Sequence, residues 1–123
     1  GWYKILFADS PENIALLEKY IRSKNYPVDF VRSHDTFIEM LPKGSSKGAA
    51  LKEYVKIMGM EDFKVIAAGD YHNDIEMLQT ADVGAATANA QPDVKKSADI
   101  VLEKSNEQGA IAELIDMIYD GKI

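Results

Sequence analysis

Apolar positions in the first third of the chain predict a small mixed α/β unit. Residues 3–8 form a short apolar run rich in strand formers, and residues 28–33 and 36–41 alternate like two half-buried strands around a polar turn. The stretch 9–24, between the runs at 3–8 and 28–33, has helical spacing, with Ser10 as N-cap and a proline in the first turn. Its predicted apolar face consists of Ile14, Leu16, Leu17, Tyr20 and Ile21.

The pattern changes after a loop-like stretch at residues 42–48. A helix is predicted over 47–59, with Ser46 as its cap and a glycine at its end. Beyond it, predicted strands and helices alternate: strands at 63–70, 82–87 and 99–102, and helices at 73–81, 92–98 and 106–119. Such alternation indicates a parallel α/β sheet with right-handed crossovers. Ligands of these sheets bind at the carboxyl ends of the strands, where Asp70 lies.

The composition of the chain limits the kinds of partner that it is expected to bind. The 123 residues are 46% hydrophobic and 28% charged, and the net charge is −6 without a run of basic residues, which argues against nucleic acid as the main partner. No apolar run approaches the roughly 18 residues of a membrane span. Without cysteine there is no thiol chemistry, and we expect a cytoplasmic protein. The first residue is glycine, so we expect that the true N-terminus is missing.

A cluster of acids and an amide follows the strand at 63–70. Asp70, Asn73 and Asp74 supply oxygen atoms, the ligands that Mg²⁺ prefers, and Gly69 is expected to let the backbone turn sharply before them. The alternative is that Asp70 and Asn73 only cap the next helix. An EF-hand is excluded, because Ile75 occupies the position of that loop's required glycine.

Lys47 is the second candidate. It falls in the first turn of a predicted helix, where a cation opposes the helix dipole but where phosphate groups bind well. Taken by itself, Lys47 is better interpreted as an ordinary solvated lysine. Its pairing with the Asp70 loop favours a functional role.

Three stretches together resemble the haloacid dehalogenase superfamily. They are KGSSKGAAL (43–51), VIAAGDYHNDIEML (65–78) and the segment 83–115, which includes Ala-Asn-Ala at 88–90. The resemblance is to the Cof-like sugar phosphatases, and its most specific motif is Gly-Asp-x-x-Asn-Asp at 69–74. It implies an α/β fold with a Rossmann-like parallel sheet. Residues 1–42 would be the C-terminal part of an α/β cap, and residues 43–123 the C-terminal part of the core.

The resemblance also implies roles for the candidate residues. Lys47 would steady the charge on the nucleophile and on the phosphoryl group. Asp70 would bind Mg²⁺, and Asn73 and Asp74 would complete or support the metal shell. The implied reaction is Mg²⁺-dependent hydrolysis of a phosphomonoester, with a sugar phosphate or another small phosphorylated metabolite as substrate.

One part of the family pattern is missing. These enzymes use an Asp-x-Asp motif, whose first aspartate is the nucleophile, and this chain contains no such motif. Asp9 is the nearest candidate, but Pro11 stands where the second aspartate belongs. We therefore expect a fragment that is inactive by itself. The strand that bears the nucleophile would pair beside residues 65–68, so we expect this open edge to associate with another copy or chain, or to belong to a longer protein.

Two alternatives stay open. A response-regulator receiver domain would use the region of Asp9 as its first acid and Lys104 as its lysine, but it lacks the second acid and a phosphoacceptor near residues 50–58. The second alternative is a non-catalytic binding remnant of the phosphatase fold. We interpret His72 as a variable loop residue, and residues 103–109 as a solvated loop that leads into the last helix.

Overall fold

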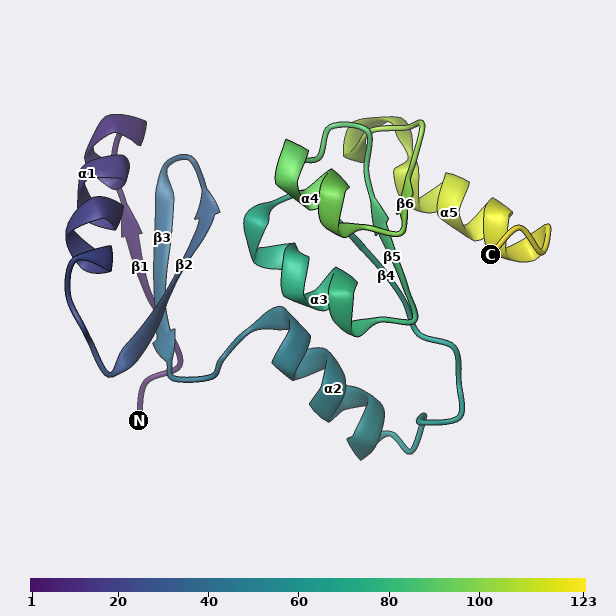
Figure 1. The fold of residues 1–123 in the computed structure, drawn as a ribbon, viewed down its shortest axis with the longest axis horizontal. Coiled ribbons are helices and arrows are strands. Elements are labelled where there is room, and N and C mark those ends of the chain that lie inside the picture. The colour runs from purple at the N-terminus through teal and green to yellow at the C-terminus, as the bar shows by residue number, and fades with distance from the viewer. The chain divides into compact units, whose positions relative to one another are not determined.

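The computed structural model describes residues 1–123, which form two compact units, 1–45 and 46–123. The boundary falls within the loop predicted for residues 42–48. Figure 1 shows the two units as separate groups of elements, and each is described by itself. The assignment of residues 1–42 to a cap and of residues 43–123 to a core stays a prediction.

The first unit is a three-stranded antiparallel sheet with one helix. Its elements are β1 (Ile5–Ala8), α1 (Pro11–Arg22), β2 (Val28–His34) and β3 (Phe37–Pro42), with strand order β1-β3-β2. This is the predicted order of elements. The core consists of Ile14 and Ile21 of α1 packed against Ile38 of β3. Serine 10 caps α1, since the Ser10 hydroxyl accepts a hydrogen bond from the Asn13 N–H at 3.3 Å.

The apolar face predicted for α1 is too wide. Leu16 and Tyr20 remain 66% and 55% exposed, whereas Ile14 and Ile21 are buried. A helix turns by about 100° per residue, so Leu16 lies about 160° around the axis from Ile14, and Tyr20 about 100° from Ile21, away from the Ile14–Ile21 stripe. The narrow sheet covers only that stripe.

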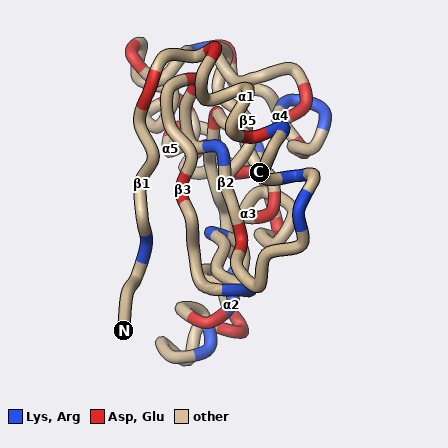
Figure 2. Tube along the Cα trace, turned by 90° about the vertical axis from the view of Figure 1, so that its left-hand side faces the viewer, with Lys and Arg blue, Asp and Glu red and all other residues tan.

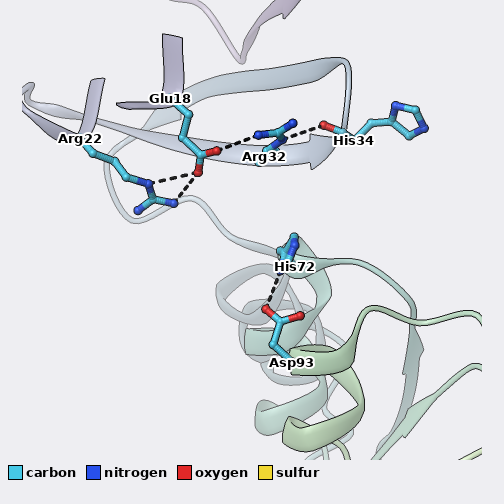
Figure 3. Close-up of polar contacts among 6 residues, drawn as sticks. All are labelled: Glu18, Arg22, Arg32, His34, His72 and Asp93. Carbon is cyan, nitrogen blue, oxygen red and sulfur yellow. Dashed lines mark hydrogen bonds and ion pairs between the residues drawn. The ribbon is translucent and has the colours of Figure 1, made fainter. Parts of the chain in front are cut away.

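Charged side chains join α1 to β2. The Glu18 carboxylate accepts hydrogen bonds from Arg22 at 2.6 Å and from Arg32 at 3.0 Å (Figure 3). Arg32 also donates to the carbonyl oxygens of His34 and Asp35, at 3.3 and 2.8 Å. Arg32 therefore fixes the β2–β3 turn to the helix.

The second unit contains the predicted parallel sheet. Strands β4 (Ile66–Gly69), β5 (Val83–Ala86) and β6 (Ile100–Val101) pair in the order β4-β5-β6. All pairs are parallel, with Ile66 opposite Val83 and Ala85 opposite Ile100. The connecting elements are α2 (Lys47–Ile57), η1 (His72–Asp74), α3 (Ile75–Thr80), α4 (Pro92–Ser97), η2 (Asn106–Gln108) and α5 (Ala110–Tyr119).

Both faces of this sheet are covered, as its continuous apolar strands predict. Ala67 and Ala86 pack with Leu78 of α3 and Val94 of α4 on one face. On the other face Ala85 packs with Leu102 and with Ala110 and Leu114 of α5. The α/β fold class predicted from the sequence is thus confirmed.

Helix α2 packs closely on α3. A methyl group added to Gly48 would lie 2.6 Å from the Glu76 Cγ and 2.9 Å from the Glu76 carbonyl oxygen. Only glycine allows this approach, which brings the first turn of α2 to the end of β4.

Strand β4 is an edge strand, because only β5 pairs with it. Helix α5 covers its face and carries an exposed apolar stripe of Ile111, Ile115 and Ile118. Figure 2 shows basic residues scattered among acidic ones along the chain, without a continuous basic stretch. None of the helices has the length and apolar character needed to span a membrane.

Candidate active site

The carboxyl ends of the parallel strands open onto a cleft of about 470 Å³. The loops after β4, β5 and β6 and the first turns of α2 and α5 surround it. This is where ligands bind in open α/β sheets. The residues that line the cleft are Lys47, Ala68, Gly69, Asp70, Asp74, Met77, Thr87, Asn106, Ala110 and Ile111.

Lys47 and Asp74 form an ion pair at this cleft. Ser46 caps α2 by accepting a hydrogen bond from the Ala49 N–H at 2.9 Å, and this cap sets Lys47 at the first helical position. The Lys47 Nζ donates to the Asp74 Oδ1. Lys47 is half exposed, whereas the Asp74 side chain is only 6% exposed. The lysine thus reaches from solvent to a buried carboxylate.

Asp74 also holds the loop that precedes it. Its Oδ2 accepts hydrogen bonds from the backbone N–H groups of Asp70 at 2.9 Å and Tyr71 at 3.1 Å. Burial works to raise the pKa of Asp74, but the Lys47 ammonium and these two N–H groups outweigh it. The pKa of Asp74 therefore lies below its usual range, and the carboxylate is ionised near neutral pH.

Gly69 provides space for Asp74. A methyl group on Gly69 would lie 2.4 Å from the Asp74 Cβ and 2.8 Å from its Cγ. The backbone of Gly69 does not have a positive φ, so a turn at this position does not depend on the conformational freedom of glycine. The residue is needed because the Asp74 side chain packs directly against its Cα.

Asp70 presents its carboxylate to the cleft. Its Oδ2 accepts hydrogen bonds from the side-chain amides of Asn89 and Asn106, each at 3.2 Å. Its Oδ1 accepts none within the chain. Asn73 lies in η1, between the two acids, and its side chain makes no hydrogen bond to the protein. The structure thus brings Lys47, Asp70 and Asp74 to one cleft.

The donor set suits a hard cation that shares its ligands with water and substrate. No group of three or more acidic, histidine or cysteine side chains is placed to enclose an ion. Mg²⁺ is commonly held by one or two carboxylates, with water and phosphate oxygens completing its shell. The unengaged Oδ1 of Asp70 fits this kind of site, whereas both oxygens of Asp74 already accept protein hydrogen bonds.

His72, interpreted from the sequence as a variable loop residue, has a side-chain partner in the structure. Its Nδ1 lies 2.6 Å from the Asp93 Oδ2 of α4 (Figure 3). Desolvation works to raise the pKa of Asp93, but the hydrogen bond and charge of His72 outweigh it and lower that pKa. The pair ties the start of η1 to α4.

Sequence reasoning missed the two amides at Asp70. Asn89 falls in the Ala-Asn-Ala stretch but carries no predicted role, and Asn106 falls in the stretch interpreted as a solvated loop. Asn106 is exposed, as a solvated loop implies, but it also lines the cleft and donates a hydrogen bond to Asp70. Both residues follow strands of the predicted parallel sheet, so their place at its carboxyl edge could have been inferred.

Comparison with known proteins identifies the family of the chain. A family model for haloacid dehalogenase-like hydrolases matches residues 1–115. The chain is 38% identical over 105 residues to phosphoglycolate phosphatase 2 of Saccharolobus solfataricus, covering 85% of the chain and 41% of that protein. The chain belongs to the haloacid dehalogenase-like hydrolase family.

Solved structures show the same fold. A haloacid dehalogenase-like hydrolase from Bacteroides thetaiotaomicron is 33% identical, with a TM-score of 0.73 over 94% of this chain and 44% of that one. A subclass IIB sugar phosphatase of the superfamily is 26% identical, with a TM-score of 0.78 over 98% of this chain and 44% of that one. The chain therefore spans less than half the length of each of these relatives.

The receiver-domain alternative is wrong. A receiver would place its first strand in the parallel sheet, but β1 pairs antiparallel with β3 in the other unit. The family match and the structural relatives agree with this correction.

Proposed function

We propose that this chain is the C-terminal part of a Mg²⁺-dependent phosphatase that hydrolyses a phosphomonoester. Residues 1–42 would belong to its cap and residues 43–123 to its core. The substrate class would be a sugar phosphate or another small phosphorylated metabolite. The family membership and the sugar phosphatase among its structural relatives support this proposal. The cytoplasm stays the expected location.

The observation that carries the proposal is the Lys47–Asp74 ion pair beside the Asp70 carboxylate. The ammonium of Lys47 is half exposed at the cleft, so it can approach a phosphoryl group while Asp74 holds its position. A fixed cation at this point would stabilise negative charge that develops on a transferring phosphoryl group. Asp74 thereby acts as the positioning residue of Lys47.

Asp70 would hold the metal ion through its unengaged Oδ1, and Asn73 would complete or support the shell. When bound, Mg²⁺ would neutralise charge on the phosphate oxygens and orient the substrate. Because Lys47 and two backbone N–H groups engage Asp74, we assign Asp74 to the support of the site rather than to direct contact with the ion.

This chain supplies no aspartate pair for a covalent phosphoryl intermediate. We therefore propose that it does not turn over by the covalent mechanism as an isolated chain. A non-catalytic binding role is the second candidate, supported by the same missing pair.

The open edge of β4, residues 65–68, is the proposed contact for a further strand. Its backbone groups on that side have no partner within the sheet, and Ile111 lies in the same cleft as Ala68. Unpaired apolar edges recruit other strands. For the isolated chain we propose self-association through this edge.

The test measures p-nitrophenyl phosphate hydrolysis with and without Mg²⁺, on protein whose intact mass is verified as 13.6 kDa. We expect no turnover from this species. Mg²⁺-dependent turnover that is lost in Asp9→Asn would contradict the proposal that the nucleophile is absent. Turnover in a longer protein that contains this segment, lost in Lys47→Met and in Asp70→Asn, is the expected positive result.

A further inference from the structure

Asn89 joins the three loops that follow β4, β5 and β6. Its Oδ1 accepts hydrogen bonds from the Thr87 hydroxyl at 3.0 Å and from the Asn106 backbone N–H at 2.9 Å. Its Nδ2 donates to the Asp70 Oδ2 at 3.2 Å. Asn106 donates from its own Nδ2 to the same Asp70 oxygen, also at 3.2 Å. Two amides thus converge on one carboxylate oxygen.

The orientation of both amides follows from their partners. A backbone N–H can only donate, so the Asn89 atom that faces the Asn106 N–H must be the oxygen. The Asn89 Nδ2 is then the atom left to face Asp70. An ionised carboxylate can only accept, so Asn106 must also present its NH₂ group to Asp70.

The two carboxylates of the loop are held in different ways. Asp74 is compensated by the ammonium of Lys47, which neutralises its charge. Asp70 is held by neutral amides, which fix its position without neutralising it. Its Oδ2 receives both donors and its Oδ1 receives none, so one oxygen is restrained and the other is available.

We propose that Asn89 and Asn106 are positioning residues that restrain the Asp70 carboxylate through Oδ2 and leave Oδ1 and the full negative charge for a divalent cation. The inference deepens the proposed function and rests on it. Asn106 is the more direct probe, because its side chain hydrogen-bonds Asp70 alone, whereas Asn89 also ties together the loops after β5 and β6.

The first test follows the NMR signals of the side-chain NH₂ groups in the absence of metal. Replacing Asp70 by Ala should move the NH₂ signals of Asn89 and Asn106 in ¹H–¹⁵N NMR spectra. The NH₂ signal of Asn25, in the other unit, should not move. Unmoved signals of Asn89 and Asn106 would overturn the inference.

The second test measures Mg²⁺ affinity by calorimetry. Asn106→Ala should weaken Mg²⁺ binding by about tenfold or more, as loss of a partner that orients a metal ligand does. The urea midpoint should stay close to that of the wild type, because Asn106 is exposed. Asn25→Ala is the matched control and should bind Mg²⁺ like the wild type.

The outcomes separate the two proposals. Unchanged Mg²⁺ affinity in Asn106→Ala would overturn the inference while leaving the proposed function intact. A wild-type chain that binds no Mg²⁺ would contradict the proposed function, and the amide signals would then decide by themselves whether the two asparagines restrain Asp70.

Discussion

Lys47 and Asp74 lie 27 positions apart in the sequence and form an ion pair in the structure. The pair joins the first turn of α2 to the loop after β4. It is asymmetric, since the Asp74 side chain is 6% exposed and that of Lys47 is 49% exposed. The same loop holds Asp70 through neutral amides. The charge of Asp74 is thus neutralised by Lys47, whereas no cation of the chain pairs with Asp70.

The first prediction concerns the energy of this pair. Asp74→Asn should lower the free energy of unfolding by about 2–3 kcal/mol, because a buried charge-assisted network is broken. Lys47→Met should lower the free energy of unfolding by on the order of 1–2 kcal/mol, because it leaves a buried carboxylate without its cation. Urea unfolding of both variants and of the double variant gives the coupling energy, which we expect to be about 1 kcal/mol.

The control is the pair of Lys4 and Glu39, 3.1 Å apart, in which the carboxylate side chain is 20% exposed rather than buried like that of Asp74. Lys4→Met should change the free energy of unfolding by less than about 0.5 kcal/mol. Equal costs for Lys47→Met and Lys4→Met would contradict the structural role of the Lys47–Asp74 pair.

The second prediction concerns the space at Gly69. Gly69→Ala should destabilise the protein by about 2–3 kcal/mol, because the new methyl group collides with the Asp74 side chain. Gly44→Ala separates collision from backbone strain, since Gly44 has a φ of 80° but its added methyl meets nothing within 4 Å. Gly44→Ala should lower the free energy of unfolding by only about 1 kcal/mol. If thermal melts show the reverse order, the close packing of Asp74 on Gly69 is wrong.

The third prediction is a pH dependence of the first unit. Burial works to raise the pKa of Glu18, but Arg22 and Arg32 outweigh it, so the pKa of Glu18 is lowered from 4.5. The folded state therefore binds the proton less readily than the unfolded state. The stabilisation by Glu18 is fully present above this usual value and is lost as the pH falls through the lower, folded pKa.

Glu18→Gln should remove this pH dependence of stability and lower the free energy of unfolding by on the order of 1 kcal/mol at neutral pH. Thermal melts of both proteins at a series of acidic pH values measure it. Glu12→Gln, a change in the exposed first turn of the same helix, is the control. A Glu18 variant that loses stability in acid as steeply as the wild type would refute the prediction.

The fourth prediction concerns the open edge of β4. Sedimentation velocity of the wild-type chain should show association that increases with concentration. Ile115→Lys, on the exposed stripe of α5, should shift the chain toward the monomer, because the stripe would be buried beside an added strand. Leu16→Lys places the same charge on an exposed apolar residue of α1 and should have no effect. A monomer at every concentration would argue against self-association.

The sequence predicted the order of elements well, because each element carries local signals. Ser10 and Ser46 are N-caps of α1 and α2 as expected, and the apolar strand at Ile66–Gly69 is covered on both faces. The apolar face predicted for α1 was too wide, although at about 100° per residue Leu16 and Tyr20 lie about 160° and 120° around the helix axis from Ile14, so the helical period alone would have excluded them.

The sequence identified only those candidate residues that stand in a recognisable local pattern. Asp70 and Asp74 stand four positions apart, and Lys47 falls at a helix start, so each has a local signal. Asn106 lies 36 positions from Asp70, and its amide gains meaning only when the sheet brings the two loops together. Contacts of this kind depend on the register of parallel strands, which hydrophobic patterns do not fix.

The most direct test of the account is a Mg²⁺ titration followed by ¹H–¹⁵N NMR, comparing wild type with Asp70→Asn and with Asp62→Asn as a matched control. We expect saturable shifts at residues 69–74 and at Asn89 and Asn106 in the wild type and in the control, and no such shifts in Asp70→Asn. Shifts that persist in Asp70→Asn, or that spread over acidic residues elsewhere, would contradict the claim that this cleft is a metal-dependent phosphatase site.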